Sequence, residues 1–172
     1  GMFNNHAFRD RVQLSGVNSI NWARIMAQTV YYVTASLALG GPDRPISFAV
    51  PTGNFGNVYA AWCARRMGLP VNKLVIGTNR NDILTRFFES GKMETGKVIP
   101  SLSPSMDIQV SSNFERYLCD LVGRDHEALK KLMAQFTQQK AFHINGDLLK
   151  EARKTFTAER CSDIETLETM GE

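Results

Sequence analysis

The clearest hydrophobic pattern in the chain lies between residues 46 and 67. Apolar residues alternate with small ones from Ile46 to Val50, which predicts a buried strand that ends at Pro51. The sequence Gly-Asn-Phe-Gly-Asn follows at 53–57, and apolar positions then recur at helical spacing as far as Met67. This segment therefore predicts a strand, a glycine-rich turn and a helix, in that order.

A second strand and helix follow directly. Lys73–Thr78 is nearly continuous in apolar residues, which predicts another buried strand, and a helix is expected from about Asp82 to Ser90. A strand, a helix and a strand within about thirty residues form a right-handed parallel crossover unit. The fold class predicted is therefore α/β, with a parallel sheet and flanking helices and a strand–helix–strand core at about 46–91.

A long helix is predicted before this core, beginning at Asn18 and ending before Gly40 and Gly41. Asn18 or Ser19 is expected to cap its N-terminus. An apolar stripe at steps of three and four residues is expected to form its buried face. The residues of this predicted stripe are Trp22, Met26, Val30, Val33 and Leu37.

The C-terminal part is predicted to be helical from about 104 to 172, after a loop-like stretch at 92–111. Ser112 with Glu115, and Ser162 with Glu165, have the spacing of a capping box, and Asp125 is the expected cap of another helix. Two predicted strands do not make a stable parallel sheet. The chain is therefore expected to be part of a larger protein.

Composition narrows the functional classes. The chain has 172 residues, 43% hydrophobic and 22% charged, with a net charge of +3, which predicts one ordinary globular domain over 1–172. Basic residues are scattered and not interleaved with aromatics, so nucleic-acid binding is not expected. No stretch reaches the ~18 apolar residues of a membrane helix. The spacing of the three cysteines suggests no metal site. A cytoplasmic protein without a membrane partner is predicted.

The glycine-rich turn is a candidate phosphate site. Gly53 and Gly56 would let the backbone approach an anion, and the first N–H groups of the following helix point at it with the favourable end of the helix dipole. Asn54 and Asn57 can add side-chain donors. The turn lacks the lysine and Ser/Thr of a nucleoside-triphosphate loop and does not match the three-glycine dinucleotide pattern. Taken alone, it fits equally well a turn that merely needs glycines.

A second group of donors lies at the start of the long helix. Asn18, Ser19, Asn21 and Arg24 place several polar side chains in its first turns. A cap together with solvated residues explains them without any ligand, and this structural explanation is favoured when the pattern is considered alone.

Five motifs in this order carry a resemblance to a known family: NSINWARIMAQ, VPTGNFGN, TNRNDIL, SPSMDIQVSSNFER and FTAER. From about Phe3 to its end, the chain closely resembles the threonine synthases, pyridoxal 5′-phosphate (PLP) enzymes of fold type II with the tryptophan synthase β-like fold. The resemblance implies that the turn binds the phosphate of PLP. Its residues are Gly53, Asn54, Phe55, Gly56 and Asn57, with Phe55 contributing its backbone N–H rather than its ring.

The resemblance also implies a substrate. The family converts O-phospho-L-homoserine and water to L-threonine and phosphate, in threonine biosynthesis. With the family motif in view, Asn18, Ser19 and Arg24 are favoured as ligands of the substrate phosphate, because Arg24 can bind two of its oxygens. Asn21 is left as a structural residue, and Asp82 and Asp107 are expected to be caps or loop-fixing groups.

Three departures from the family pattern concern catalysis. The family's lysine, which holds PLP as a Schiff base, lies upstream of this segment, and none of the lysines from Lys73 to Lys154 sits in a matching motif. The partner of the pyridine nitrogen lies downstream, and the small domain that closes over the ring is absent. The chain is therefore expected to be an internal, large-domain piece of the enzyme, with no catalytic residue of its own and inactive alone. An exposed sheet edge would favour its self-association.

Two other functions stay open. A related fold-type-II lyase, such as a threonine dehydratase-like enzyme, would use the same cofactor, although it has no substrate phosphate for Asn18, Ser19 and Arg24 to hold. A non-catalytic module that binds a phosphate-bearing ligand or a partner chain would explain the missing lysine if the chain is a natural truncation.

Overall fold

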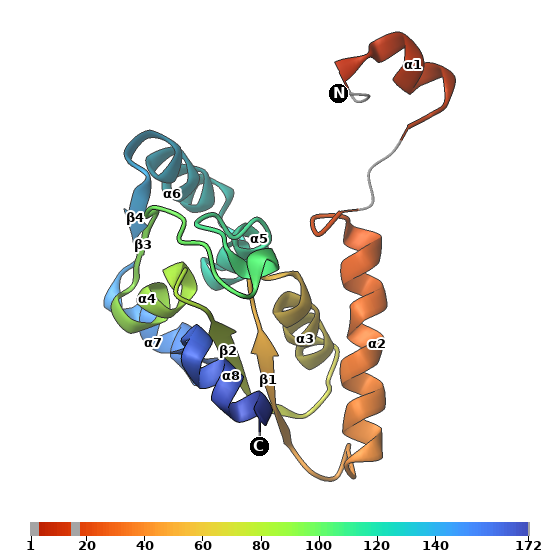
Figure 1. Ribbon diagram of the computed structural model, residues 1–172. Coiled ribbons are helices and arrows are strands. Elements are labelled where there is room, and N and C mark those ends of the chain that lie inside the picture. Colours follow the sequence, from red (N-terminus) through yellow and green to blue (C-terminus); the bar gives the residue numbers. More distant parts are fainter. Residues whose placement is uncertain (1–3, 15–17, 172) are drawn as a thin grey trace.

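The computed structural model describes residues 4–14 and 18–171. Its centre is a parallel sheet of three strands in the order β1 (Ile46–Pro51), β2 (Val71–Thr78) and β5 (Phe156–Arg160) (Figure 1). Val50 of β1 pairs with Ile76 of β2, and Ile76 pairs with Ala158 of β5. The predicted α/β fold class is confirmed.

The predicted crossover from β1 to β2 is also confirmed. Helix α3 (Gly56–Arg66) connects the two strands, and Met67 is its C-cap. The chain turns at Gly68, whose φ of 108° is in the left-handed region that favours glycine. On the other side of α3 lies α2 (Trp22–Ala38), and the two helices run side by side (Figure 1).

The connection from β2 to β5 is long and contains several elements. Helix α4 (Ile83–Ser90) follows β2, and Gly91 ends it at a φ of 77°. Strand β3 (Lys92–Glu94) pairs antiparallel with β4 (Ala141–His143) in a separate small sheet. Between them lie a short 3₁₀ turn and two helices, and a third helix precedes β5. These are Pro104–Met106, α5 (Phe114–Leu121), α6 (His126–Gln139) and α7 (Gly146–Thr155).

The prediction of an all-helical C-terminal half is wrong. Residues 104–172 contain β4 and also β5, which is the third strand of the main sheet. In β5 only Phe156 is buried, and its neighbours Thr157 and Glu159 are exposed. So short and polar a segment carries no strand signal of its own, because its pairing partner is far away in the sequence.

Helix α2 differs from its prediction in both cap and buried face. Its N-cap is Asn21, whose side chain accepts a hydrogen bond from the N–H of Ala23 at 2.9 Å, and not Asn18 or Ser19. The side chains that it buries are Ile25, Tyr32 and Ser36. In the predicted stripe Val33 is half-buried, while the others are exposed. These exposed residues are Trp22, Met26, Val30 and Leu37.

One predicted capping box is confirmed and the other is wrong. Ser162 and Glu165 exchange hydrogen bonds at 2.7 and 3.2 Å at the start of α8 (Asp163–Gly171). In contrast, Asn113 is the N-cap residue of α5, and the hydroxyl of Ser112 donates to Oδ1 of Asn54 at 3.2 Å. Asp125 caps α6 as predicted.

The remaining helix, α1 (His6–Arg11), has no buried residue. Of the helices that the structure describes, none combines the length and apolar character needed to cross a membrane. Within the same residues, His, Cys, Asp and Glu nowhere gather into a group of three that could hold a metal ion.

Candidate functional site

The glycine-rich loop leaves the carboxyl end of β1, at the edge of the sheet where open α/β folds bind ligands (Figure 1). Thr52 fixes its start, because its N–H donates to the carbonyl of Gly77 at 2.7 Å and its hydroxyl donates to that of Val50 at 2.6 Å. Phe55 then adopts a left-handed conformation with φ of 61° as the N-cap residue of α3. This turn directs the backbone of the loop toward solvent while the Phe55 ring, 1% exposed, enters the core.

The loop presents a run of unpaired backbone donors. From Gly53 to Val58, no N–H donates to an acceptor in the described part of the chain. Phe55 provides no side-chain cap for α3, so the positive end of this helix is open as well. Converging N–H groups at a helix N-terminus bind phosphate and similar anions. The loop therefore has the donors that the phosphate of a cofactor such as PLP requires.

The two glycines also lie close to other segments of the chain. A Cβ on Gly53 would lie 3.1 Å from the carbonyl oxygen of Ser105 and 3.3 Å from Cα of Met106. A Cβ on Gly56 would lie 3.3 Å from the Asn113 amide nitrogen. The absence of a side chain at these two positions thus allows residues 105–106 and Asn113 to pack directly against the loop.

A cavity of about 240 Å³ joins the loop to the start of α2. Pro51–Asn57 form one wall, and Ser19, Arg24 and Gln28 form the other. Arg24 is the charged side chain among the described residues that line it, so the cavity favours an anion. One cavity is therefore lined both by the residues predicted to bind the cofactor phosphate, Gly53–Asn57, and by two of those predicted to bind the substrate phosphate, Ser19 and Arg24.

Asn18 does not line this cavity. Its Oδ1 accepts a hydrogen bond from the N–H of Ile20 at 3.1 Å, and its carbonyl accepts one from the N–H of Asn21 at 3.1 Å. Asn18 thus shapes the turn that leads into α2. Gln28, which does line the cavity, was not expected from the sequence, although it follows Arg24 by one helical turn.

Both loop asparagines are held with their amide nitrogens free. Oδ1 of Asn54 accepts from Ser112, and Oδ1 of Asn57 accepts from the hydroxyl of Tyr32 at 2.6 Å. Neither Nδ2 donates to another residue that the structure describes. These hydroxyls therefore leave the NH₂ groups available to an anion. Tyr32, which lies on α2 and is 5% exposed, was not predicted from the sequence as part of this site.

Residues 111–113 hold the glycine-rich loop in place through hydrogen bonds to its carbonyl groups. The hydroxyl of Ser111 donates to the carbonyl of Gly53 at 2.8 Å. Asn113 is fully buried, and both its N–H and its side-chain amide donate to the carbonyl of Asn54 at 3.0 Å. The same amide also reaches the carbonyl of Ser19 at 2.8 Å. Asn113 thus connects the two walls of the cavity.

Asp107 holds the loop that covers Gly53, as expected for a loop-fixing residue. Its carboxylate accepts hydrogen bonds from Oγ of Ser101 at 2.6 Å, Nδ2 of Asn79 at 2.7 Å and Nδ2 of Asn81 at 3.0 Å. The Ser101 hydroxyl and the two amides stabilise the charged form and lower the pKa of Asp107, against an opposing effect of desolvation. This network ties residues 101–107 to the end of β2.

We predict that Asp107→Asn destabilises the chain in a pH-dependent way. The pKa of Asp107 is lowered in the folded chain. The stabilisation that the Asp107 carboxylate gives the folded chain is therefore present above the ordinary aspartate pKa of about 3.9. It is lost as the pH falls toward the lower pKa that Asp107 has in the folded chain. Urea unfolding should show a difference between wild type and Asp107→Asn that is full at neutral pH and shrinks below pH ~4. The exposed Asp43→Asn is the control, and an equal difference at all pH values would contradict the prediction.

Of the two roles expected for Asp82, a cap or a loop-fixing group, capping by its side chain is not observed. Its side chain makes no capping hydrogen bond, although it occupies the N-cap position of α4. Instead it pairs with Arg86 at 2.9 Å and with Arg160 of β5 at 2.8 Å. Asp82 thus connects α4 to the edge strand of the sheet.

The sequence is closely similar to curated threonine synthases. The enzyme of Pseudomonas aeruginosa is 50% identical over 170 residues, which is 99% of this chain and 36% of that protein. The enzyme of Saccharomyces cerevisiae is 43% identical over 181 residues, covering 98% of this chain and 35% of the yeast protein. This chain thus spans about a third of the length of these relatives. No protein-family model matches it.

Solved structures agree with the sequence comparison. The crystal structure of PLP-bound threonine synthase from Brucella melitensis superimposes with a TM-score of 0.92 at 55% identity, over 96% of this chain and 36% of that one. The yeast threonine synthase gives a TM-score of 0.88 at 40% identity, over 98% and 35% of the two chains. The chain is therefore homologous, over nearly its whole length, to a segment of the threonine synthases.

Proposed function

We propose that this chain is the phosphate-binding segment of a PLP-dependent, fold-type-II threonine synthase that converts O-phospho-L-homoserine and water to L-threonine and phosphate. One observation carries the proposal: the unpaired N–H groups of Gly53–Asn57 and the Arg24 side chain surround the same cavity. An enzyme that handles a phosphorylated substrate with a phosphorylated cofactor needs two sets of anion-binding groups. The close homology to threonine synthases supports this assignment.

PLP, when bound, supplies an electron-withdrawing ring that stabilises the charge left on the substrate when its protons are removed. The residues of this chain bind and orient the cofactor and the substrate. Gly53, Asn54, Phe55, Gly56 and Asn57 hold the cofactor phosphate through backbone N–H groups and the two asparagine amides. The Phe55 ring fixes the loop in the core and makes no contact with the cofactor.

Arg24 and Ser19 bind the substrate phosphate, and Asn18 acts through the turn that it stabilises. Arg24 lines the cavity from the first turn of α2, and the open N-terminus of α3 on the other wall also favours negative charge. Its planar guanidinium can donate to two phosphate oxygens at once. Holding the leaving phosphate in a fixed orientation favours its departure from the carbon that carries it.

The whole protein that contains this segment provides the test of the proposed reaction. With PLP and O-phosphohomoserine we expect equal amounts of threonine and phosphate. With threonine alone we expect no 2-oxobutanoate. Deamination of threonine without phosphate release would instead support the dehydratase-like lyase, and binding without either reaction would support a non-catalytic module. The comparisons favour neither alternative.

We predict that the isolated chain does not form threonine. By the family resemblance, its lysines lie outside the motif that bears the cofactor, so it can hold a phosphate but lacks the reactive amine. Incubation of the chain with PLP and O-phosphohomoserine, followed by amino-acid analysis, should give no threonine above a protein-free control. Turnover that exceeds this background would show that another group replaces the lysine.

We also propose a cytoplasmic location for the whole protein, because of its resemblance to the threonine synthases.

A further inference from the structure

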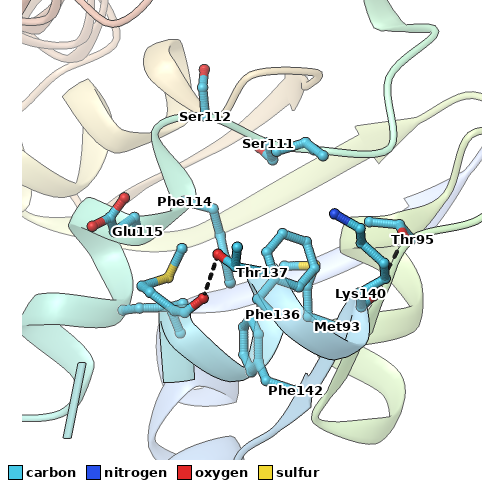
Figure 2. Close-up of a pocket in the computed structure, with 13 residues that line it drawn as sticks. Met93, Thr95, Ser111, Ser112, Phe114, Glu115, Phe136, Thr137, Lys140 and Phe142 are labelled. Atoms are coloured by element: carbon cyan, nitrogen blue, oxygen red, sulfur yellow. Dashed lines mark hydrogen bonds between the residues drawn. The ribbon is translucent and has the colours of Figure 1, made fainter. Parts of the chain in front are cut away.

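A second cavity lies on the other side of the segment that supports the loop. It has a volume of about 320 Å³ and is bordered by α5, α6 and the small antiparallel sheet of β3 and β4 (Figure 2). Among the described residues, none lines both this cavity and the one at the glycine-rich loop. Its volume is at the lower end of the range for small-molecule pockets, about 300–1,000 Å³.

The floor and walls of this cavity are apolar. Met93, Phe114, Leu118 and Phe142 form its base and are 1–3% exposed, and Phe136 closes one side. Figure 2 shows the rings of Phe114, Phe136 and Phe142 grouped around Met93. Aromatic rings and a thioether make a surface that fits a flat or branched hydrocarbon group. A ligand that fits this cavity therefore needs an apolar part about the size of one aromatic ring.

Among the polar groups at the rim of the cavity, the ammonium of Lys140 is available to bind a ligand. The hydroxyls of Ser111, Ser112 and Thr137 already donate to other residues. The ammonium of Lys140 makes no hydrogen bond or ion pair with any residue that the structure describes, and its side chain extends along the same side of the cavity as Thr95 (Figure 2).

The negative charge at the rim is well separated from this cation. The carboxylate of Glu115 lies on the opposite side of the cavity from Lys140 (Figure 2). The nearest acidic residue in β3, Glu94, pairs with Lys92 at 2.9 Å. An anionic group is thus attracted to the Lys140 side and repelled from the Glu115 side, which gives a ligand one preferred orientation.

We propose that this cavity is a second ligand site, which binds a small carboxylate with an apolar, single-ring-sized body. The hydrocarbon part lies against Phe114, Phe136 and Met93, and the carboxylate pairs with Lys140. The site is distinct from that of the proposed threonine synthase reaction, because its described lining includes none of the residues assigned to the cofactor or substrate phosphate.

The test is an NMR titration of the ¹⁵N-labelled whole protein that contains this chain, with 3-phenylpropanoate and with its neutral analogue, 3-phenylpropanamide. Both should shift the amide signals of residues 93–95, 114–118 and 133–142, and the carboxylate should bind about threefold more tightly, as expected for one exposed ion pair. Shifts confined to 53–58 would place the carboxylate at the phosphate loop and would overturn the proposal. Shifts confined to α2, or no shifts, would do the same.

Two variants separate charge from shape. Lys140→Gln should remove the threefold preference for the carboxylate and leave binding of the amide unchanged, whereas Lys131→Gln, on α6 but outside the cavity, should change neither. Thr137→Trp, an exposed position at the rim, should fill the cavity and weaken both ligands at least tenfold. An unchanged preference in Lys140→Gln would overturn the ligand class, even if Thr137→Trp failed to fold.

Discussion

Replacing Phe55 by alanine is expected to lower the free energy of unfolding by about 3–5 kcal/mol, the usual cost of deleting a buried phenylalanine ring. The ring is 1% exposed. Its centroid lies 5.0 Å from that of Phe114 and 5.9 Å from those of Tyr117 and Phe156. These rings come from α5 and β5, so Phe55 fixes the glycine-rich loop to elements that are distant in the sequence. Urea unfolding measures the loss.

The conformation of Phe55 provides a control for this prediction. At φ of 61° a residue with a side chain is strained by about 1 kcal/mol relative to glycine. Phe55→Gly should therefore be no less stable than Phe55→Ala, although glycine is normally the more destabilising of the two. A loss below ~1 kcal/mol in Phe55→Ala would mean that the ring does not fix the loop.

The sequence predicted the centre of the fold because local and global signals agree there. The alternation from Ile46 to Val50, the turn at 53–57 and the stop at Gly68 each specify their element without help from distant residues. The capping box of Ser162 and Glu165 also involves only neighbours, and it forms as predicted. Elements of this kind can be predicted from a single sequence.

The errors occur where a distant partner decides the structure. Ser112 has the spacing of a cap, but Asn54 offers it a hydrogen bond from another part of the chain. The five residues of β5 become a strand through pairing with β2. For the same reason Tyr32, Ser111 and Asn113 were missed at the candidate site. Their role depends on contacts with the loop that span between 25 and 59 residues of sequence.

The candidate site itself was only partly predictable. The loop was found because a strand, glycines and a helix start occur together, and the family resemblance assigned it to PLP. The sequence pattern did not reveal that Arg24 and the loop line one cavity, or that the Asn18 side chain accepts a hydrogen bond within the turn before α2. Which phosphate Arg24 binds is therefore the most informative question about this site.

In the whole enzyme, Arg24→Gln is expected to lower kcat/KM for O-phosphohomoserine about a hundredfold. Two hydrogen bonds from a guanidinium to a phosphate contribute about 3 kcal/mol together, and glutamine keeps neither the charge nor the bidentate geometry. Steady-state kinetics with phosphate detection measures the effect. Arg44→Gln, which removes an exposed arginine outside the cavity, should leave kcat/KM unchanged.

The affinity for PLP separates the two roles that Arg24 could have in this shared cavity. If Arg24 binds the substrate phosphate, Arg24→Gln leaves the dissociation constant of PLP unchanged, whereas Gly56→Val, which brings a side chain against Asn113, weakens PLP binding. If Arg24→Gln weakens PLP binding as strongly as Gly56→Val does, Arg24 belongs to the cofactor phosphate. The substrate phosphate would then be bound elsewhere, because the other described residues that line the cavity carry no positive charge.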